Sequence, residues 1–316
     1  SNSGDLTLTS NNSQTKIFLD QAPGAIDFYP ANSLRFKLDD NSRISLGNND
    51  SGGDTTNTIF GYTSGNSIAS GGIKNTLFGK STGHSISTGD HNTNVGWEAG
   101  YYNATGVNNT AIGSGSMMGA GTSDVHDNNT AVGYNSLKAI TTGDDNVAIG
   151  SNSLDALTSG ARNTALGYNS ATALGAAETG NISIGWNSMS TMDEGSGGTI
   201  NYNIALGVQA LSGADLGSGT EDISQNIAIG TDAGATSQLT QAVAIGFNAG
   251  ETTQGQSSVA IGTNAGQTTQ GTGSVAIGSN AGQTTQGNAS VAIGPDAGTS
   301  QGTASVAIGQ GAGNST

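Results

Sequence analysis

The sequence predicts an all-β fold: a parallel β-roll, or β-solenoid, of about sixteen short coils with a small β-rich cap at its N-terminus. Three observations lead to this prediction. A short motif ending in glycine recurs along most of the chain, the residues before that glycine alternate between two kinds of side chain, and the apolar residues are few but regularly placed, at 33% of 316 residues. A short period sustained across most of a chain is the signature of a solenoid.

Residues 1–42 lack the repeat, and we interpret them as a β-rich cap or adaptor. They contain short alternating apolar segments, at 16–19, 26–29 and 34–38, broken by Asn, Gly and Pro. This pattern is typical of strands separated by turns. Because the terminal repeats of a solenoid need a cover, a cap over the first coil is expected.

From residue 43 onward each coil is marked by an anchor glycine that follows a large apolar residue. The anchors are Gly47, Gly61, Gly79, Gly96, Gly113, Gly133, Gly150, Gly167, Gly185, Gly207, Gly230, Gly246, Gly262, Gly278, Gly294 and Gly309. Their spacing runs from 14 to 23 residues and settles at 16 between Gly230 and Gly294. We therefore divide the repeats into an irregular part, residues 43–230, and a regular part, residues 231–316.

The four residues before each anchor predict a strand with two different faces. The first and third residues before the glycine are Val, Ile, Leu, Phe or Thr, whereas the second is usually Ala and the fourth is usually polar, as in Asn-Thr-Ala-Ile at 109–112. Such period-two alternation is typical of a strand. We expect the large apolar side chains to form the thin core, and the Ala-rich face to allow close approach by another surface.

The polar residue four before the anchor is asparagine in ten consecutive coils. Coils stacked one strand spacing apart, about 4.8 Å, would bring these amides within reach of one another. We interpret the row as a structural ladder rather than a ligand site. Its members are Asn57, Asn75, Asn92, Asn109, Asn129, Asn146, Asn163, Asn181, Asn203 and Asn226.

The residues after the anchor differ between the two parts. They read x-Asn-Ser-Leu in the irregular part, as at 134–137, and x-Asn-Ala-Gly in the regular part, as at 263–266. We expect a turn or second short strand here, and thinner coils toward the C-terminus. A roll with two or three large apolar side chains per coil buries little surface alone. We therefore expect rolls to associate, most simply as a parallel homotrimer.

The repeats resemble two groups of surface proteins. The phrase SVAIG-x-x-A resembles the head domains of trimeric autotransporter adhesins, and the longer NTAIG-Y-N-S-L variants are similar to repeats in tail-fibre and other structural proteins of tailed phages. The resemblance covers about residues 43–316, although the period here is often 17 or more. It implies a left-handed parallel β-roll with three chains to a bundle.

We expect this protein to be a structural tail fibre of a virion, acting as a stiff trimeric spacer and as a host-surface attachment element. Its location would then be the virion or an extracellular surface. Its partners would be its own copies, other virion tail proteins and a host cell-surface glycan or protein. Two alternatives stay open: a bacterial trimeric surface adhesin and a tailspike-type enzyme that degrades polysaccharide.

Two sets of residues are candidates for receptor contact. Aromatic residues gather directly after the anchors, where exposed rings could stack on sugars and buried rings would fill a corner or a groove between chains. Three long segments between strands, 114–128, 186–202 and 208–225, are the second set, because binding residues concentrate on loops. The candidate contact residues are Tyr62, Trp97, Tyr134, Tyr168, Trp186, Asp193 and Glu194, with Phe247 as a further aromatic.

Charge and composition exclude several functions. The net charge is −15 and no Lys or Arg follows Arg162, so we expect no nucleic-acid partner, because binding to a phosphate backbone depends on basic residues. No run of 18 apolar residues occurs, so we expect no membrane insertion.

We predict no enzyme activity, no cofactor and no metal site. Glycoside hydrolysis needs two carboxyl groups about 5 to 9 Å apart. Asp144/Asp145 and Asp193/Glu194 are merely neighbours in sequence. Neither the Asp144–Asn146 nor the Asp124–Asp127 segment has the ligand spacing of a calcium loop. His84, His91 and His126 also lack the spacing of metal ligands, and the chain has no cysteine.

Overall fold

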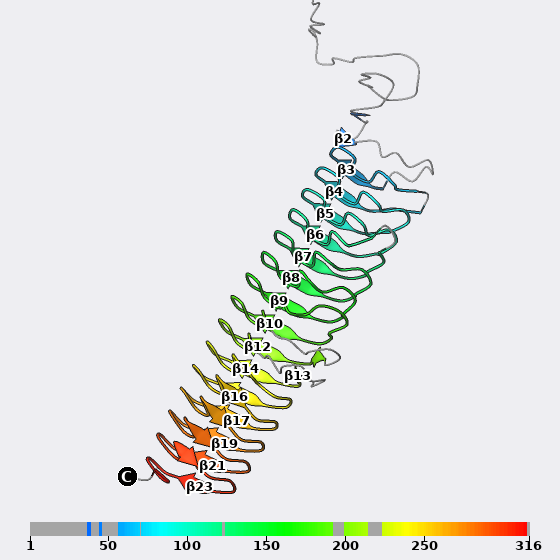
Figure 1. Cartoon of the computed structure of the whole chain (residues 1–316). Coiled ribbons are helices and arrows are strands. Elements are labelled where there is room, and N and C mark those ends of the chain that lie inside the picture. The colour runs from blue at the N-terminus through cyan, green and yellow to red at the C-terminus, as the bar shows by residue number, and fades with distance from the viewer. Residues whose placement is uncertain are drawn as a thin grey trace, which may run out of the picture.

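The computed structural model is a parallel β-solenoid, and it contains no helix among the residues that it describes. These are residues 56–69, 71–121, 124–191, 199–213 and 223–314, together with two strands at 37–38 and 44–45. The coils stack in a single row, so that segments distant in sequence lie side by side along one axis (Figure 1). The predicted all-β parallel solenoid is confirmed.

One fifteen-stranded parallel sheet runs along the whole solenoid and takes one strand from each coil. Its strands are β3 (Thr58–Phe60), β4 (Thr76–Phe78), β5 (Thr93–Val95), β6 (Thr110–Ile112), β7 (Thr130–Val132), β8 (Val147–Ile149), β9 (Thr164–Leu166), β10 (Ile182–Ile184), β12 (Ile204–Leu206), β14 (Ile227–Ile229), β15 (Val243–Ile245), β17 (Val259–Ile261), β19 (Val275–Ile277), β21 (Val291–Ile293) and β23 (Val306–Ile308). Fourteen spacings of about 4.8 Å make this main sheet about 67 Å long.

Three smaller sheets accompany the main sheet. In the regular part, β16 (Thr253–Gln254), β18 (Thr269–Gln270), β20 (Thr285–Gln286) and β22 (Ser300–Gln301) form a second parallel sheet, and β11 (Ile200–Asn201) pairs in parallel with β13 (Ile223–Ser224). Before the solenoid, β1 (Lys37–Leu38) pairs antiparallel with β2 (Ile44–Ser45). The first anchor, Gly47, and most of the expected cap lie outside the described residues.

The register of the main sheet is constant although the coils differ in length. Thr110 pairs with Thr130 across a 20-residue coil, and Val147 pairs with Thr164 across a 17-residue coil. The extra residues are therefore accommodated outside the strands. As a result, residues at equal distances from successive anchors form straight rows along the rod.

The two faces of the main sheet are reversed relative to the prediction. Ala148 and Ala165 are completely buried, whereas Ile149 and Leu166, the next residues in the same strands, are 38% and 44% exposed. The large core side chains come instead from the segment after the anchor, as with Leu137. The coil is narrow enough that alanine on the strand fills the space left by leucine on the opposite wall. The expectation that the strands' large side chains form the core is wrong, and the Ala-rich face is not available to a partner.

The asparagine row lies inside the coil and links each turn to the next. In the nine links between its members, the Oδ1 of one asparagine accepts the backbone N–H of the following one, at 2.8–3.0 Å. Up to Asn203, each Nδ2 also donates to a carbonyl of the next coil, as from Asn146 to Gly160 at 2.9 Å. These amides hydrogen-bond to buried backbone groups at a corner of the coil, where those groups no longer pair with a neighbouring strand.

The described anchor glycines, except Gly309 in the last coil, cannot be replaced without disturbing two coils. In the described coils their φ lies between +113° and +145°, a region that residues with a Cβ rarely adopt. A Cβ on Gly150 would also lie 2.1 Å from the carbonyl oxygen of Gly167 in the next coil. The close approach of one backbone to the next therefore explains why this position is glycine in every repeat.

The regular part replaces large apolar core residues with a buried glutamine row that sequence analysis missed. Gln254 is buried, and its Nε2 donates to the carbonyl of Val243 at 2.7 Å. Gln270 and Gln286 repeat this bond in the next two coils. A Cβ on Gly250 would lie 2.4 Å from the Oε1 of Gln254. The glycine that replaces leucine after the anchor thus makes room for the glutamine.

Candidate functional site

Four aromatic side chains follow the anchor glycines of alternate strands. Tyr62, Trp97, Tyr134 and Tyr168 come after β3, β5, β7 and β9, and we call them the aromatic row. They are 73%, 52%, 56% and 50% exposed, respectively. Their rings are therefore open to solvent and do not fill a corner of the single roll.

Trp186 and Phe247 occupy the same position after β10 and β15, and both are exposed. They lie outside the strict alternation, because Trp186 is one coil from Tyr168 and Phe247 is three coils further on. We therefore treat them as neighbours of the aromatic row rather than as members.

Asparagine amides lie beside the aromatic row. Asn135, Asn152 and Asn169 directly follow the row position, are partly exposed and have φ of +52° to +55°. Asparagine tolerates this left-handed conformation better than most residues. The Nδ2 of Asn152 donates to the Oδ1 of Asn169 at 3.2 Å. Beside Tyr134 and Tyr168 the edge thus combines rings with amides that can hydrogen-bond hydroxyl groups, whereas Thr63 and Glu98 occupy the equivalent positions beside Tyr62 and Trp97.

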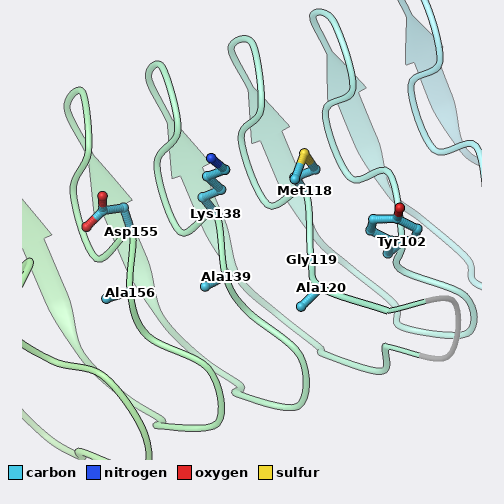
Figure 2. A pocket seen from close by; sticks show the side chains of 8 residues that line it. All are labelled: Tyr102, Met118, Gly119, Ala120, Lys138, Ala139, Asp155 and Ala156. Atoms are coloured by element: carbon cyan, nitrogen blue, oxygen red, sulfur yellow. The ribbon is translucent and has the colours of Figure 1, made fainter.

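A second candidate is a shallow groove of about 580 Å³ across the coils that follow β5 to β8. Figure 2 shows Tyr102, Met118, Lys138 and Asp155 extending from successive coils above small residues. Backbone bonds hold these coils together, with Tyr102 N–H donating to the carbonyl of Met118 at 2.9 Å. The small lining residues are Gly119, Ala120, Ala139 and Ala156.

Aromatic residues border this groove at its N-terminal end. The rings of His84 and Tyr101, from adjacent coils, stack at 4.7 Å between centroids, and Tyr101 meets Tyr102 edge-on at 4.5 Å. The sequence did not mark this groove as a site, because the position five residues after the anchor holds a different residue type in each coil, as with Tyr101, Met118 and Lys138.

The pKa of the Asp155 carboxyl in the groove depends on its burial and on its neighbours. Partial burial raises the pKa of the Asp155 carboxyl, whereas hydrogen bonds from the backbone and the positive charge of Lys138 act in the opposite direction. The groove therefore offers a cation, a carboxyl group and a phenol over small residues, an arrangement suited to hydrogen-bonding a small polar molecule.

The long segments proposed for receptor contact are only partly described, and part of the first lies inside the roll. Met117 and His126 are completely buried, so these residues of the 114–128 segment do not form a surface. Asp193 and Glu194 lie outside the described residues, as does half of the 208–225 segment, residues 214–222.

Acidic residues considered for calcium have structural partners instead. The Oδ1 of Asp144 accepts the backbone N–H of Asp127 at 2.7 Å, and the Oδ1 of Asp127 accepts that of Val107 at 2.7 Å. Asp124 accepts the N–H groups of Ala120 and Gly121. In the part of the chain that the structure describes, no three His, Asp or Glu side chains are grouped as metal ligands.

His126 is a buried histidine at a position where the adjacent coils have glycine, Gly106 and Gly143. Among the described residues, neither of its ring nitrogens has a hydrogen-bond partner. Burial lowers the pKa of His126 to about 4, against a weaker opposing effect of Asp127. The folded chain therefore keeps this imidazole neutral at pH values where the unfolded chain would protonate it.

Because of His126, we expect the folded protein to lose stability in acid. The pKa of His126 is lower in the folded chain than in the unfolded chain. The free energy of unfolding is therefore retained above about pH 6.5 and falls, by about 3 kcal/mol in total, as the pH drops toward 4. We expect His126→Leu to remove this component, as measured by urea unfolding between pH 7 and pH 4. His91→Gln, at an exposed position, should retain it. Parallel pH profiles for wild type and His126→Leu would contradict the prediction.

No protein-family model, curated protein or solved structure matches this chain. The functional assignment below therefore depends on the geometry of the coils and on the resemblance of the repeats.

Proposed function

We propose that this chain is a structural fibre protein that assembles with two further copies of itself into a stiff rod, forms part of a virion tail fibre and contacts the host surface. The outward face of the main sheet supports the assembly most directly. Along all fifteen strands this face carries two rows of apolar or Thr side chains, many of them substantially exposed. The virion setting is supported by the resemblance of the longer repeats to those of phage fibres.

The size of this outward face favours a partner. Strands of three residues at about 3.3 Å each make it about 10 Å wide, so a length of about 67 Å gives about 670 Å². Although Thr occupies one of the two rows in β3 to β7 and in β9, this face is comparable in size to the largest apolar patch on a typical monomer, roughly 300–600 Å². It also approaches the roughly 800 Å² that each partner buries in a stable complex. Three identical faces around one axis would cover one another, as closed symmetry requires.

Charges on the outward face should separate the copies without unfolding them. Ile112 and Ile149 lie two coils apart on this face and are both more than one-third exposed. We expect wild type to have three times the mass of one chain in sedimentation equilibrium, and the double variant Ile112→Lys/Ile149→Lys to have the mass of one. Its circular dichroism should remain that of a β-protein, because neither side chain lines the interior.

The matched control is Thr252→Lys/Thr284→Lys, which places two lysines two coils apart at exposed positions away from the main sheet. This variant should keep the wild-type mass. A wild-type protein that is monomeric at micromolar concentration, or one that forms only dimers, would refute the three-chain assembly.

A further inference from the structure

We infer that the aromatic row binds an uncharged, extended polysaccharide that lies along the rod, with one ring against every second sugar. This inference builds on the proposed attachment role and names its ligand class. The row provides a series of exposed rings on successive alternate coils rather than a pocket, which suits a polymer running over several coils.

The main support for this inference is the spacing of the rings. One coil step separates the stacked rings of Phe60 and Phe78, whose centroids are 4.9 Å apart. Members of the aromatic row are two coils apart, and therefore about 10 Å from one another. This distance is comparable to one disaccharide unit of an extended polysaccharide, in which every second sugar presents the same face. The whole row covers about three such units.

The aromatic row is regularly spaced because backbone hydrogen bonds between coils fix the position of each ring-bearing residue. The carbonyls of Tyr62, Trp97 and Tyr134 accept backbone N–H groups from the next coil at 2.9 Å in each case. That of Tyr168 accepts one at 3.0 Å. A rigid platform loses little conformational entropy when a ligand binds, which favours affinity. Side chains between the rings are Lys80, Ser114 and Ser151.

The chemistry of the edge favours a neutral sugar polymer. Aromatic rings offer apolar area with only two rotatable side-chain bonds. The adjacent amides of Asn135, Asn152 and Asn169 can hydrogen-bond to hydroxyl groups. Lys80 is the single charge among the residues that occupy the row position between Tyr62 and Tyr168. The net charge of −15 repels anionic polymers over the surface.

Affinity electrophoresis of the full chain tests the ligand class. The probe is hydroxyethyl cellulose, a neutral β-1,4-linked polymer with an extended chain, and soluble amylose, whose α-linked chain coils, is the comparison. We expect retardation by the first and little by the second. The variant Trp97→Ala/Tyr134→Ala/Tyr168→Ala should bind about tenfold or more weakly. Absence of binding, equal binding of both polymers, or unchanged affinity of the variant would overturn the inference.

A position swap tests the spacing at constant composition. The double variant Trp97→Ser/Ser114→Trp keeps the number of rings but moves one ring by one coil, away from the two-coil interval. We expect it to lose as much affinity as Trp97→Ser alone. Wild-type affinity in the swap would show that ring spacing does not select the ligand, and the inference would fail.

Measuring the mass of each variant separates this inference from the proposed assembly. Aromatic variants that bind weakly but retain the wild-type mass support the ligand site. Variants that lose mass together with affinity would place the rings in the interface between chains and overturn the inference, while leaving the fibre proposal intact. Conversely, the Ile112→Lys/Ile149→Lys monomer should still be retarded by hydroxyethyl cellulose, because its aromatic row is unchanged.

Discussion

Replacement of Gly150 by alanine is expected to destabilise the middle of the roll by on the order of 3–5 kcal/mol. Gly150 has φ of +133°, and a Cβ there would lie 2.1 Å from the carbonyl oxygen of Gly167. The clashing atom belongs to the backbone, and it cannot move aside as a side chain can by changing its rotamer. Relief therefore requires that these two coils separate, and the inter-coil bond from Gly167 N–H to the Ile149 carbonyl, 2.8 Å long, would weaken.

Gly175→Ala is the matched control, because a Cβ at Gly175 has no atom of the described residues within 4 Å and its φ is not in the left-handed region. We expect this substitution to change stability by less than about 1 kcal/mol. Urea unfolding followed by circular dichroism measures both variants. Hydrogen exchange should locate the loss around β8 and β9, since solenoids are stabilised by contacts between neighbouring coils. Equal stability of the two variants would contradict the explanation given for the anchors.

Replacement of Asn146 by alanine is the second substitution with a large expected effect. The Oδ1 of Asn146 accepts the backbone N–H of Asn163 at 2.9 Å, and its Nδ2 donates to the carbonyl of Gly160 at 2.9 Å. Alanine leaves both backbone groups without their partner in a buried site. Because each such group costs about 1–3 kcal/mol, we expect a loss on the order of 3–5 kcal/mol in the free energy of unfolding.

Asn226→Ala is the control for this substitution, because Asn226 is at the end of the row. Within the part of the chain that the structure describes, its Nδ2 has no hydrogen-bond partner, and its Oδ1 accepts the backbone N–H of Ala242 at 2.9 Å. The next coil already has alanine at the equivalent position, Ala242. We expect this variant to lose less than half as much stability as Asn146→Ala in the same urea titration. A reversed order would show that the row does not stabilise the solenoid through these amides.

The repeat and the amide row could be predicted because each depends on a position counted from the nearest anchor. The glutamine row was also readable, since Gln254, Gln270 and Gln286 all stand eight residues after an anchor. The groove residues Met118, Lys138 and Asp155 also share one position, five residues after an anchor, but no residue type recurs there, so no sequence pattern marks the groove.

The period of the chain, the strands before each anchor, the need for glycine at the turn and the position of the aromatic rings all follow from the order of the residues. The order of the residues does not determine which face of the strand is buried. Alternation such as Ala148 next to Ile149 defines two faces but does not show which of them points inward. That choice depends on the distance between the walls of the closed coil. Large residues such as Leu137 occupy the opposite wall, so most coils have a small residue such as alanine beneath the strand, and the aliphatic face is left on the outside.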